Sequence, residues 1–489
     1  MTVKTLADFH REVDPMYVDS SPVPIFNRKL SPGTRSVIIT SAQNATPVHA
    51  GFWRALMAAC NTYNSEMVVI PIRYKNPTSR WSGSQENAEH WVEEVRPYLS
   101  STRTKLNENC LLLADIKIQP TASDPLTGFE AVSQDMSAIV GHPKIQTRTV
   151  AAPQNKLPKV LMTTGACTVA NYSDTRVGRV GEFHHSLSAV IVELQGGLFF
   201  ARRLHYDIKS HSITDTVRRK QFFDTGKVVT SARAAALITG DLHERMACPK
   251  AVNATWGPGG MVEIGEPEHI VYHDSVDGCS VNPHHGKDPF SRIAKINAGF
   301  TARHEIESFR DFVTAHTRRK SQNVIVMSNH DDFFTRYIKS QDWRDDPVNA
   351  DWYLETALYM VKNTKMTTAG VKHPDAFRYW MEKYNLRNTL LLGSDESFMI
   401  RGVELSMHGD RGPNGSRGSI KNIRRVGVKS VIGHSHTPGE DEGCTQVGTM
   451  TRLRLDYNFG PSSWLNANCY LNADGKRQLI FLIDGKFHN

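Results

Sequence analysis

Short apolar runs that end in polar, metal-binding side chains recur through the second half of this 489-residue chain. The runs HIVY, NVIV and SVI are each followed within three residues by aspartate, asparagine or histidine. Helical patterns separate some of them, as at 301–316, where Ile306, Phe309 and Phe312 share one face. Strands that alternate with helices favour an α/β fold with a parallel sheet, and such sheets carry ligand sites at the carboxyl ends of their strands.

Five segments carry these side chains. In chain order they are Gly240-Asp241-Leu242-His243, His273-Asp274-Ser275-Val276-Asp277-Gly278, Ser328-Asn329-His330-Asp331, His408-Gly409 and Gly433-His434-Ser435-His436. Asp241 and His243 lie two positions apart, so at the end of a strand both can reach one ion. Asp274 can bridge two ions, because a carboxylate has two acceptor oxygens. Each segment alone is weak evidence, but five in order are hard to explain by chance.

The other candidate ligands are the amide of Asn329 and the imidazoles of His408, His434 and His436. A mixed oxygen and nitrogen shell without thiolate suits Mn²⁺, Zn²⁺ or Fe²⁺ better than Mg²⁺ alone. Two cations roughly 3.5–4 Å apart can hold a water as hydroxide and clamp a phosphate for in-line attack. We therefore predict phosphoester hydrolysis at two divalent cations, with Mn²⁺ as the first choice and Zn²⁺, Fe²⁺ or Mg²⁺ as alternatives.

The segment Asn329-His330-Asp331 also supplies candidate catalytic residues. His330 directly follows a candidate ligand and is placed to give a proton to the leaving oxygen. Asp331 is predicted to hold that imidazole in orientation, as acid–histidine pairs commonly do.

The order D-x-H, D, N-H-D, H and G-H-x-H resembles the calcineurin-like metallophosphoesterase superfamily, in particular its SbcD-like nuclease branch. The resemblance covers about residues 230–450 and implies a four-layer α/β/β/α sandwich with a two-metal centre. It implies a first metal held by Asp241, His243, Asp274 and His436, and a second held by Asp274, Asn329, His408 and His434. By the same resemblance, His330 is the catalytic histidine.

Two departures from that pattern are His273 and Ser328, which stand where glycine is usual and are expected to affect only the turns. The arginine that follows this motif in protein phosphatases is absent, because Gly278 and Cys279 come after Asp277. That absence argues against a Ser/Thr phosphatase.

The length of the chain predicts at least two domains. Residues 36–74 read as strand, loop, helix and strand, the start of an α/β unit with a parallel pair. We predict a separate N-terminal α/β domain over 1–204 for substrate or partner recognition, a partly helical connector over 205–229 and the catalytic sandwich over 230–489. A hairpin is expected at 187–207 and another in the C-terminal tail. No internal repeat is visible.

The formal charge of +8 favours a polyanionic partner, most commonly nucleic acid, although a merely basic surface is an equal alternative. Between the fourth and fifth segments, residues 411–430 hold six basic residues and no acid. This segment suits a phosphate backbone, and the alternative is a flexible solvated loop. The candidate substrate contacts are Arg411, Arg417, Lys421, Arg424 and Arg425.

Three functions remain open from the sequence. The first is a metal-dependent DNA nuclease. An α/β domain placed before a phosphoesterase with a basic loop also looks like phage proteins of this superfamily implicated in degrading host DNA. The second is a small-molecule phosphatase or cyclic-nucleotide phosphodiesterase, and the third is a non-catalytic DNA- or protein-binding regulator. The N-terminal domain is expected to mediate association, either with further copies of this chain (a homo-oligomer) or with another protein.

The cysteines and the apolar runs bear on the cellular setting. Seven scattered cysteines without a CxxC motif predict reduced, mostly buried thiols and a cytoplasmic setting, the host cytoplasm for a phage protein. The sequence has no apolar run of 18 residues, so no membrane span is expected.

Overall fold

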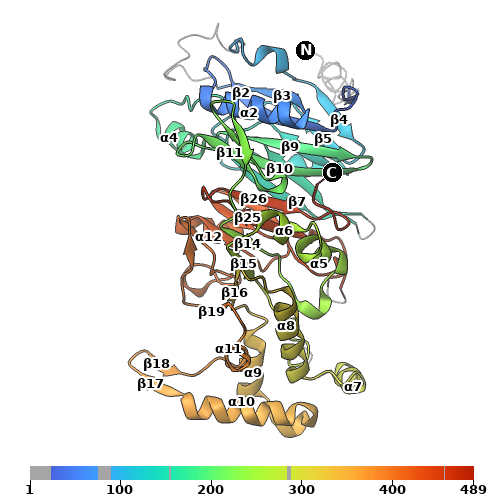
Figure 1. The fold of residues 1–489 in the computed structure, drawn as a ribbon, viewed down its shortest axis with the longest axis vertical. Helices are drawn as coiled ribbons and strands as arrows, with labels where there is room; N and C mark the ends of the chain where they lie inside the picture. The colour runs from blue at the N-terminus through green and yellow to red at the C-terminus, as the bar shows by residue number, and fades with distance from the viewer. Residues whose placement is uncertain (1–23, 75–89, 154–155, 283–287, 456–457, 489) are drawn as a thin grey trace, which may run out of the picture.

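The computed structural model describes residues 24–74, 90–153, 156–282, 288–455 and 458–488 and shows a mixed α/β protein with several sheets. The molecule is elongated (Figure 1). The N-terminal half lies at one end, and a helical arm that includes α10 (Ala350–Asn363) lies at the other. The sheets between these ends hold the core and position the site.

The N-terminal half begins with the predicted strand, helix and strand. They are β2 (Ser36–Gln43), α2 (Ala50–Tyr63) and β3 (Glu66–Ile72), and β2 pairs with β3 in parallel. The predicted hairpin is β9 (Ser188–Gln195) with β10 (Leu198–Asp207). One face of this sheet packs on α2, and the other packs on β5 (Cys110–Leu113), β6 (Ser137–Val140) and β8 (Lys159–Thr163).

The segment predicted as a partly helical connector, 205–229, is mostly strand. It supplies the end of β10, then β11 (Ser212–Asp215), β12 (Lys220–Phe223) and most of β13 (Val228–Thr230), with one short 3₁₀ turn at Thr216–Arg218. These strands extend the sheet of β2. The physical reason is burial, because Ile213 and Phe222 are fully buried in the core shared with α2.

The second half contains the predicted parallel sheet. Its parallel strands are β14 (Ala236–Ile238), β15 (His269–Tyr272), β16 (Gln322–Val326) and β19 (Thr389–Leu392). The tail hairpin, β25 (Ala467–Leu471) and β26 (Arg477–Phe481), continues this sheet beside β14. Alternate side chains of β14 enter two different cores, since Leu237 faces one and Ala236 and Ile238 face the other.

Helices cover the first of these two faces. They are α5 (Pro249–Trp256), α6 (Met261–Gly265), α8 (Ala302–His316), α9 (Asp332–Ser340) and α11 (Ala376–Tyr384). The second face packs on β21 (Val403–Glu404), β22 (Ser430–Ile432) and the segment after β24 (Cys444–Gln446). The short helix α12 (Ile420–Ile423) packs on the outer side of that second sheet.

One sheet runs through both halves. Strand β7 (Gln146–Val150) pairs antiparallel with β23 (Gly439–Asp441), which joins strands of the two halves into eleven. The predicted domain limits at 204 and 230 stay predictions, but the two halves are connected by strand pairing as well as by the chain.

The strand order repeats on the two sides of this junction. One side reads β4 (Arg103–Asn107), β5, β6, β8, β7, and the other reads β20 (Met399–Ile400), β21, β22, β24, β23 from the edge inward. The pair directions also match, antiparallel at both ends and parallel between. The other two sheets match in the same way: the order β3-β2-β9-β10 in the sheet of β2 corresponds to β15-β14-β25-β26 in the sheet of β14. The chain therefore builds one topology twice.

Individual backbone hydrogen bonds pair the residues of the two halves. The bond from Cys167 N to Ser41 O (2.8 Å) matches that from Met450 N to Asp241 O (2.7 Å). The bond from His49 N to Cys167 O (2.8 Å) matches that from Cys248 N to Met450 O (2.7 Å). The bond from Thr164 N to Val140 O (3.1 Å) matches that from Val447 N to Ile432 O (2.8 Å). By these pairs Ser41 takes the place of Asp241. The segment Gly141-His142-Pro143-Lys144 after β6 likewise takes the place of Gly433-His434-Ser435-His436 after β22.

All seven cysteines are free and most are buried, as predicted. Within the described ranges, no helix combines the length and the apolar character that a membrane crossing requires.

Candidate metal centre

The candidate ligands follow the carboxyl ends of strands in two facing sheets. Asp241, Asp274 and Asn329 come after β14, β15 and β16 of the six-stranded sheet. His408 follows β21, and His434 and His436 follow β22, in the second sheet. The turns that carry these residues are strained, because four non-glycine ligands have positive φ: His243 (39°), Asp274 (42°), His434 (76°) and His436 (59°). Strain of this kind is typical of functional sites.

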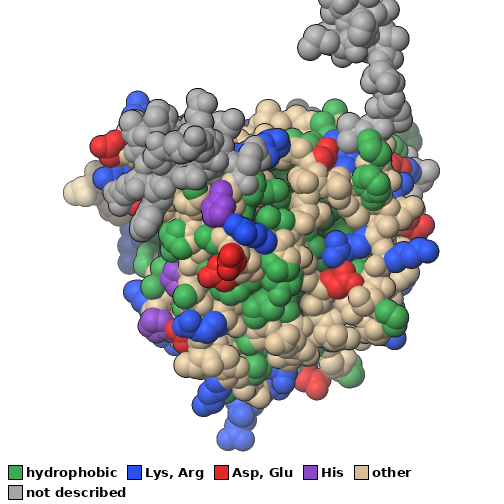
Figure 2. Space-filling model, turned by 90° about the horizontal axis from the view of Figure 1, so that it is seen from above, with side chains coloured by type: hydrophobic (Ala, Val, Ile, Leu, Met, Phe, Trp, Pro, Cys, Tyr) green, Lys and Arg blue, Asp and Glu red, His purple; other side chains and the backbone are tan. Residues whose placement is uncertain are grey.

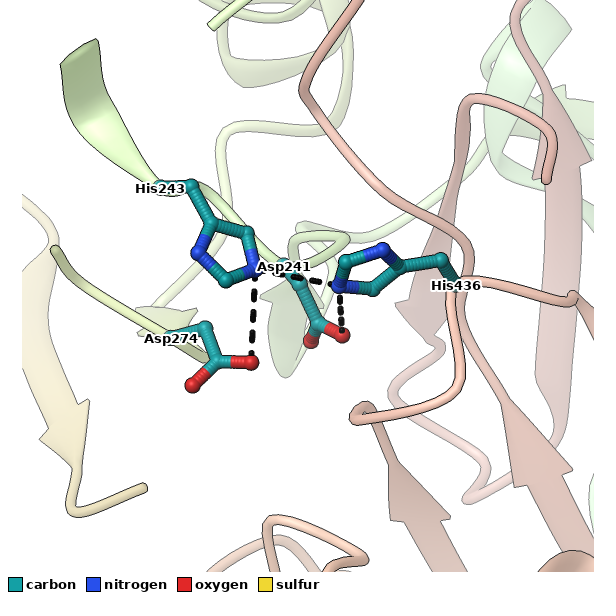
Figure 3. A group of neighbouring side chains, drawn as sticks. All are labelled: Asp241, His243, Asp274 and His436. Atoms are coloured by element: carbon teal, nitrogen blue, oxygen red, sulfur yellow. Dashed lines mark hydrogen bonds and ion pairs between the residues drawn. The ribbon is translucent and has the colours of Figure 1, made fainter. Parts of the chain in front are cut away.

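The first group of ligands is Asp241, His243, Asp274 and His436 (Figure 3). Each offers one ligand atom, and these atoms all lie within 4.8 Å of one another. His243 Nε2 lies 3.4 Å from Asp274 Oδ2, and His436 Nε2 lies 3.2 Å from Asp241 Oδ2. All four residues are buried, so this group has the composition and the spacing of a metal site.

A second group lies on the other side of Asp274. Asn329 Oδ1 is 3.1 Å from both His408 Nε2 and His434 Nδ1. His408 Nε2 is also 3.2 Å from Asp274 Oδ2. Asp274 therefore touches both groups, and the structure brings together all seven residues that the sequence proposes as ligands.

The charges in this centre call for a cation. Both carboxylate oxygens of Asp241 and Oδ1 of Asp274 are buried and accept no hydrogen bond. A buried carboxylate without partners is costly unless positive charge compensates it. The donor set of carboxylate, imidazole and amide oxygens fits a divalent transition metal.

The pKa values of these groups reflect the same charges. Burial would raise the pKa of Asp274, but the imidazoles of His408, His330 and His243 outweigh it and hold that pKa well below its usual range. Burial would lower the pKa of His243 and His408, but Asp274 raises each to about 9. Without metal the centre thus takes up protons in place of cations.

The structure places His330 beside the first group but gives it a different partner from the one predicted. Its ring centroid lies 4.6 Å from that of His243, and its Nδ1 donates to the backbone carbonyl of Asp277 at 2.7 Å. The carboxylate of Asp331 instead accepts hydrogen bonds from the amide and the hydroxyl of Ser328, at 3.1 and 3.0 Å. The prediction that Asp331 orients His330 is therefore wrong. Adjacent residues at the start of α9 point their side chains in different directions.

Asp277 is the residue that the sequence reasoning passed over. Its Oδ1 lies 3.4 Å from His243 Nδ1, and its carbonyl holds His330. It forms a further group with these two histidines in which the ligand-type atoms lie close together. Burial would raise its pKa, but the hydrogen bond and charge of His243 outweigh burial and hold the pKa far below its usual range. The signal in the sequence was its place three residues after Asp274.

His273 affects more than a turn. Its imidazole is fully buried, its ring centroid lies 5.6 Å from that of His408, and neither of its nitrogens has a hydrogen bond among the described residues. Burial, and then the charge of His408, lower its pKa to about 4, so this ring is neutral.

The basic segment after His408 folds back on itself. Gly418 N donates to Asp410 O at 2.8 Å, and the backbones of Arg411 and Arg417 form an antiparallel β-bridge across the turn. Four of the five predicted substrate contacts are exposed: Arg411, Arg417, Lys421 and Arg425. Arg424 is different, because its guanidinium is half-buried and lies 2.6 Å from Asp441 and 3.3 Å from Glu442. Its charge is engaged within the protein.

The fold and site define a mixed α/β protein with a buried His/Asp cluster able to bind metal. No protein-family model matches the chain. It is 30% identical over 471 residues to Protein A1 of Escherichia phage T5, an alignment that spans 92% of this chain and 82% of the phage protein. The chain therefore belongs to the family of phage T5 Protein A1, and this relative supports the expected phage origin.

Proposed function

We propose that this protein is a two-metal-dependent phosphodiesterase of the calcineurin-like superfamily, and that its substrate is DNA. The observation that carries the proposal is the contact of Asp274 with both ligand groups. The succession of helices, six-stranded sheet, second sheet and α12 is a further support for this proposal.

We assign the residues of the site to two roles, metal binding and proton transfer. Two divalent cations, when bound, would neutralise a phosphodiester and supply an activated water, with Mn²⁺ as our first choice. Asp241, His243, Asp274 and His436 would hold one cation, and Asp274, Asn329, His408 and His434 the other. The hydrogen bond of His330 Nδ1 to the Asp277 carbonyl fixes a proton on Nδ1 and turns Nε2 away from that carbonyl. Nε2 is then the ring atom that can give a proton to the leaving oxygen.

The choice of DNA rests on charge near the centre. The exposed cations of the basic segment are tethered beside His408, because Gly418 packs on the backbone of Gly409 and Asp410. A row of exposed Arg and Lys side chains suits a phosphate backbone more than a single phosphate. On the face of the N-terminal half seen from above, the described residues carry acidic and basic side chains scattered among one another (Figure 2).

The test is cleavage of supercoiled plasmid by the purified full-length protein with Mn²⁺, Mg²⁺ or EDTA. Asp274→Ala is the disabled variant, and Ser41→Ala, at the matching position of the N-terminal half, is the control. We expect metal-dependent cleavage by the wild type and the control and none by Asp274→Ala. Hydrolysis of a chromogenic phosphodiester without plasmid cleavage would favour a small-molecule phosphodiesterase. No hydrolysis of either substrate would favour a non-catalytic regulator.

A further inference from the structure

A polar cavity of about 540 Å³ lies where the two halves meet. It is lined from the N-terminal half by Lys144 and the stretch from Phe183 to Ser186, and by His205 of β10. The second half contributes Lys429 before β22, the β23–β24 turn, and Lys476 and Arg477 at the start of β26. Its walls carry five Lys and Arg side chains and three carboxylates, so its net charge depends on how these are paired.

The three carboxylates of the cavity are all engaged by cations. Glu440 lies 3.2 Å from the buried guanidinium of Arg203. Asp441 lies 2.6 Å from Arg424, and Glu442 lies 2.7 Å from Lys144. Each of the three carboxylates is therefore neutralised by a cation in an ion pair.

Three further cations, Lys429, Lys476 and Arg477, line the cavity. Arg477 donates to the backbone carbonyls of Ser430 and Gly443, and Lys476 lies 3.7 Å from Asp207 at the edge. The ammonium of Lys429 has no hydrogen bond or ion pair with any described residue. Its pKa is lowered, first by burial and then by repulsion from Lys476 and Arg477. Asp207 pairs with Lys476 alone, so this group of three cations keeps net positive charge, which suits an anion.

The repeat of the fold explains the position of one cation of this cavity, Lys144. Thr449 N donates to Leu465 O at 3.1 Å and Ala166 N to Ser186 O at 2.9 Å, which pairs Ser186 with Leu465. His185 therefore matches Trp464, whose ring lies 4.2 Å from that of His436. In the N-terminal half Lys144 stands in the place of His436 and forms a β-bridge with His185.

The N-terminal counterpart of the centre is closed to metal by its own bonds. Ser41 Oγ donates to Gly165 O at 2.6 Å, and Gln43 Nε2 donates to Asn171 O at 2.5 Å. The ammonium of Lys144 would also repel a cation. The metal centre of the second half would hold a phosphate through cations. In the cavity, ammonium and guanidinium groups would take the place of those metals.

We propose that this cavity binds a phosphate group through Lys429, Lys476 and Arg477. The site is separate from the metal centre, because Lys429 precedes β22 whereas His434 and His436 follow it. The phosphate belongs either to a free nucleotide or to a nucleic-acid backbone, since both present the same chemistry.

The experiment is calorimetric titration of the full-length protein with inorganic phosphate, in EDTA and in an Asp274→Asn background that disables the metal centre. The test variant is Lys429→Gln/Lys476→Gln. The matched control is Lys365→Gln/Lys372→Gln, which removes two exposed charges from the arm. We expect the test pair to weaken phosphate binding at least about tenfold, as expected for loss of charge-assisted contacts, and the control to leave it unchanged. Equal losses in both pairs, or no binding by the parent, would overturn the proposal.

Two further arms identify the source of the phosphate. ATP binding tighter than phosphate and lost in the test pair points to a nucleotide. A short duplex that competes with phosphate, and whose affinity falls in the test pair, points to a nucleic-acid backbone. The test pair should unfold at a temperature no lower than that of the wild type, because removing Lys429 and Lys476 relieves repulsion between like charges. Since cleavage plays no part in these measurements, the phosphate site can fail while the proposed nuclease stands, and the reverse.

Discussion

The two halves of this protein share strand order, strand direction and several matched backbone hydrogen bonds, yet among the described residues the candidate metal ligands gather in the second half. Where the second half has Asp241 and His436, the N-terminal half has Ser41 and Lys144. The framework is thus compatible with two different chemistries, and a few residues at strand ends decide between them.

The difference also lies in how polar groups are satisfied. Ser41 and both ring nitrogens of His142 have hydrogen-bond partners within the N-terminal half. In the second half, carboxylate oxygens of Asp241 and Asp274 are buried without any. The oxygens left without partners in the matching N-terminal turn, such as Gln43 Oε1, are uncharged, whereas those of the second half carry negative charge that a cation could compensate.

The largest expected effect comes from removing the shared ligand. Asp274→Ala should abolish cleavage and weaken metal affinity by more than about 100-fold, the upper range for losing even an indirect partner of a metal. Metal content measured by mass spectrometry after dialysis tests this. Gln43→Ala, in the corresponding turn of the N-terminal half, should keep its full metal content. Equal loss in both variants would break the contrast between the halves.

The next largest effect is on turnover. His330→Ala should lower the cleavage rate by about 10²–10⁴-fold, the usual scale for a general acid, while the protein keeps its metal. Single-turnover cleavage and metal analysis on one preparation separate the two effects. Full activity in this variant would reject the catalytic role of His330.

A smaller effect is expected at Asp277. Asp277→Asn should weaken metal affinity by about 10–100-fold, because its carboxylate no longer orients and charges His243. Asp331→Asn is the comparison, since its carboxylate contacts Ser328 and not His330. If Asp331→Asn lost metal as strongly as Asp277→Asn, this assignment would be wrong.

Two pairs of histidines, one pair in each half, should respond to pH with opposite sign when metal is absent. Burial lowers the pKa of His142 and of His185 to about 4, below the value near 6.5 in the unfolded chain. Their contribution to stability is present above pH 6.5 and is lost as pH falls toward 4. Between pH 6.5 and 5 this costs about 2 kcal/mol for each histidine.

His243 and His408, with pKa raised to about 9, behave in the opposite way. Their contribution is present below pH 6.5 and is lost as pH rises through 9. Urea unfolding in EDTA at pH 5, 7 and 9 measures both trends. The acid-side loss should shrink in His185→Gln, and an unchanged profile would contradict the pKa of that histidine.

The smallest expected effects lie in the basic segment. Arg411→Gln or Arg425→Gln should weaken DNA binding a few-fold and reduce the slope of log affinity against log salt by about 1. Arg424→Gln should leave that slope unchanged and lower stability, because it breaks the pair with Asp441. Binding measured at several salt concentrations distinguishes these outcomes.

The sequence by itself determined the main strands of the second half, the order of the motifs and the candidate ligand residues. An apolar run such as HIVY specifies a buried strand locally, and the side chain of Asp274 has the same chemistry in any fold. The parallel sheet then had to bring such strand ends together, because parallel strands end at one edge.

Only the tertiary structure decided the rest. The pairing of β7 with β23 joins residues nearly 300 positions apart, and no local pattern encodes such a contact. The same holds for Arg424, which looks free in the sequence but pairs with Asp441, and for Asp277, which takes the role predicted for Asp331. The repeat stayed hidden because backbone hydrogen bonds define a fold, whereas the side chains at its strand ends are free to change.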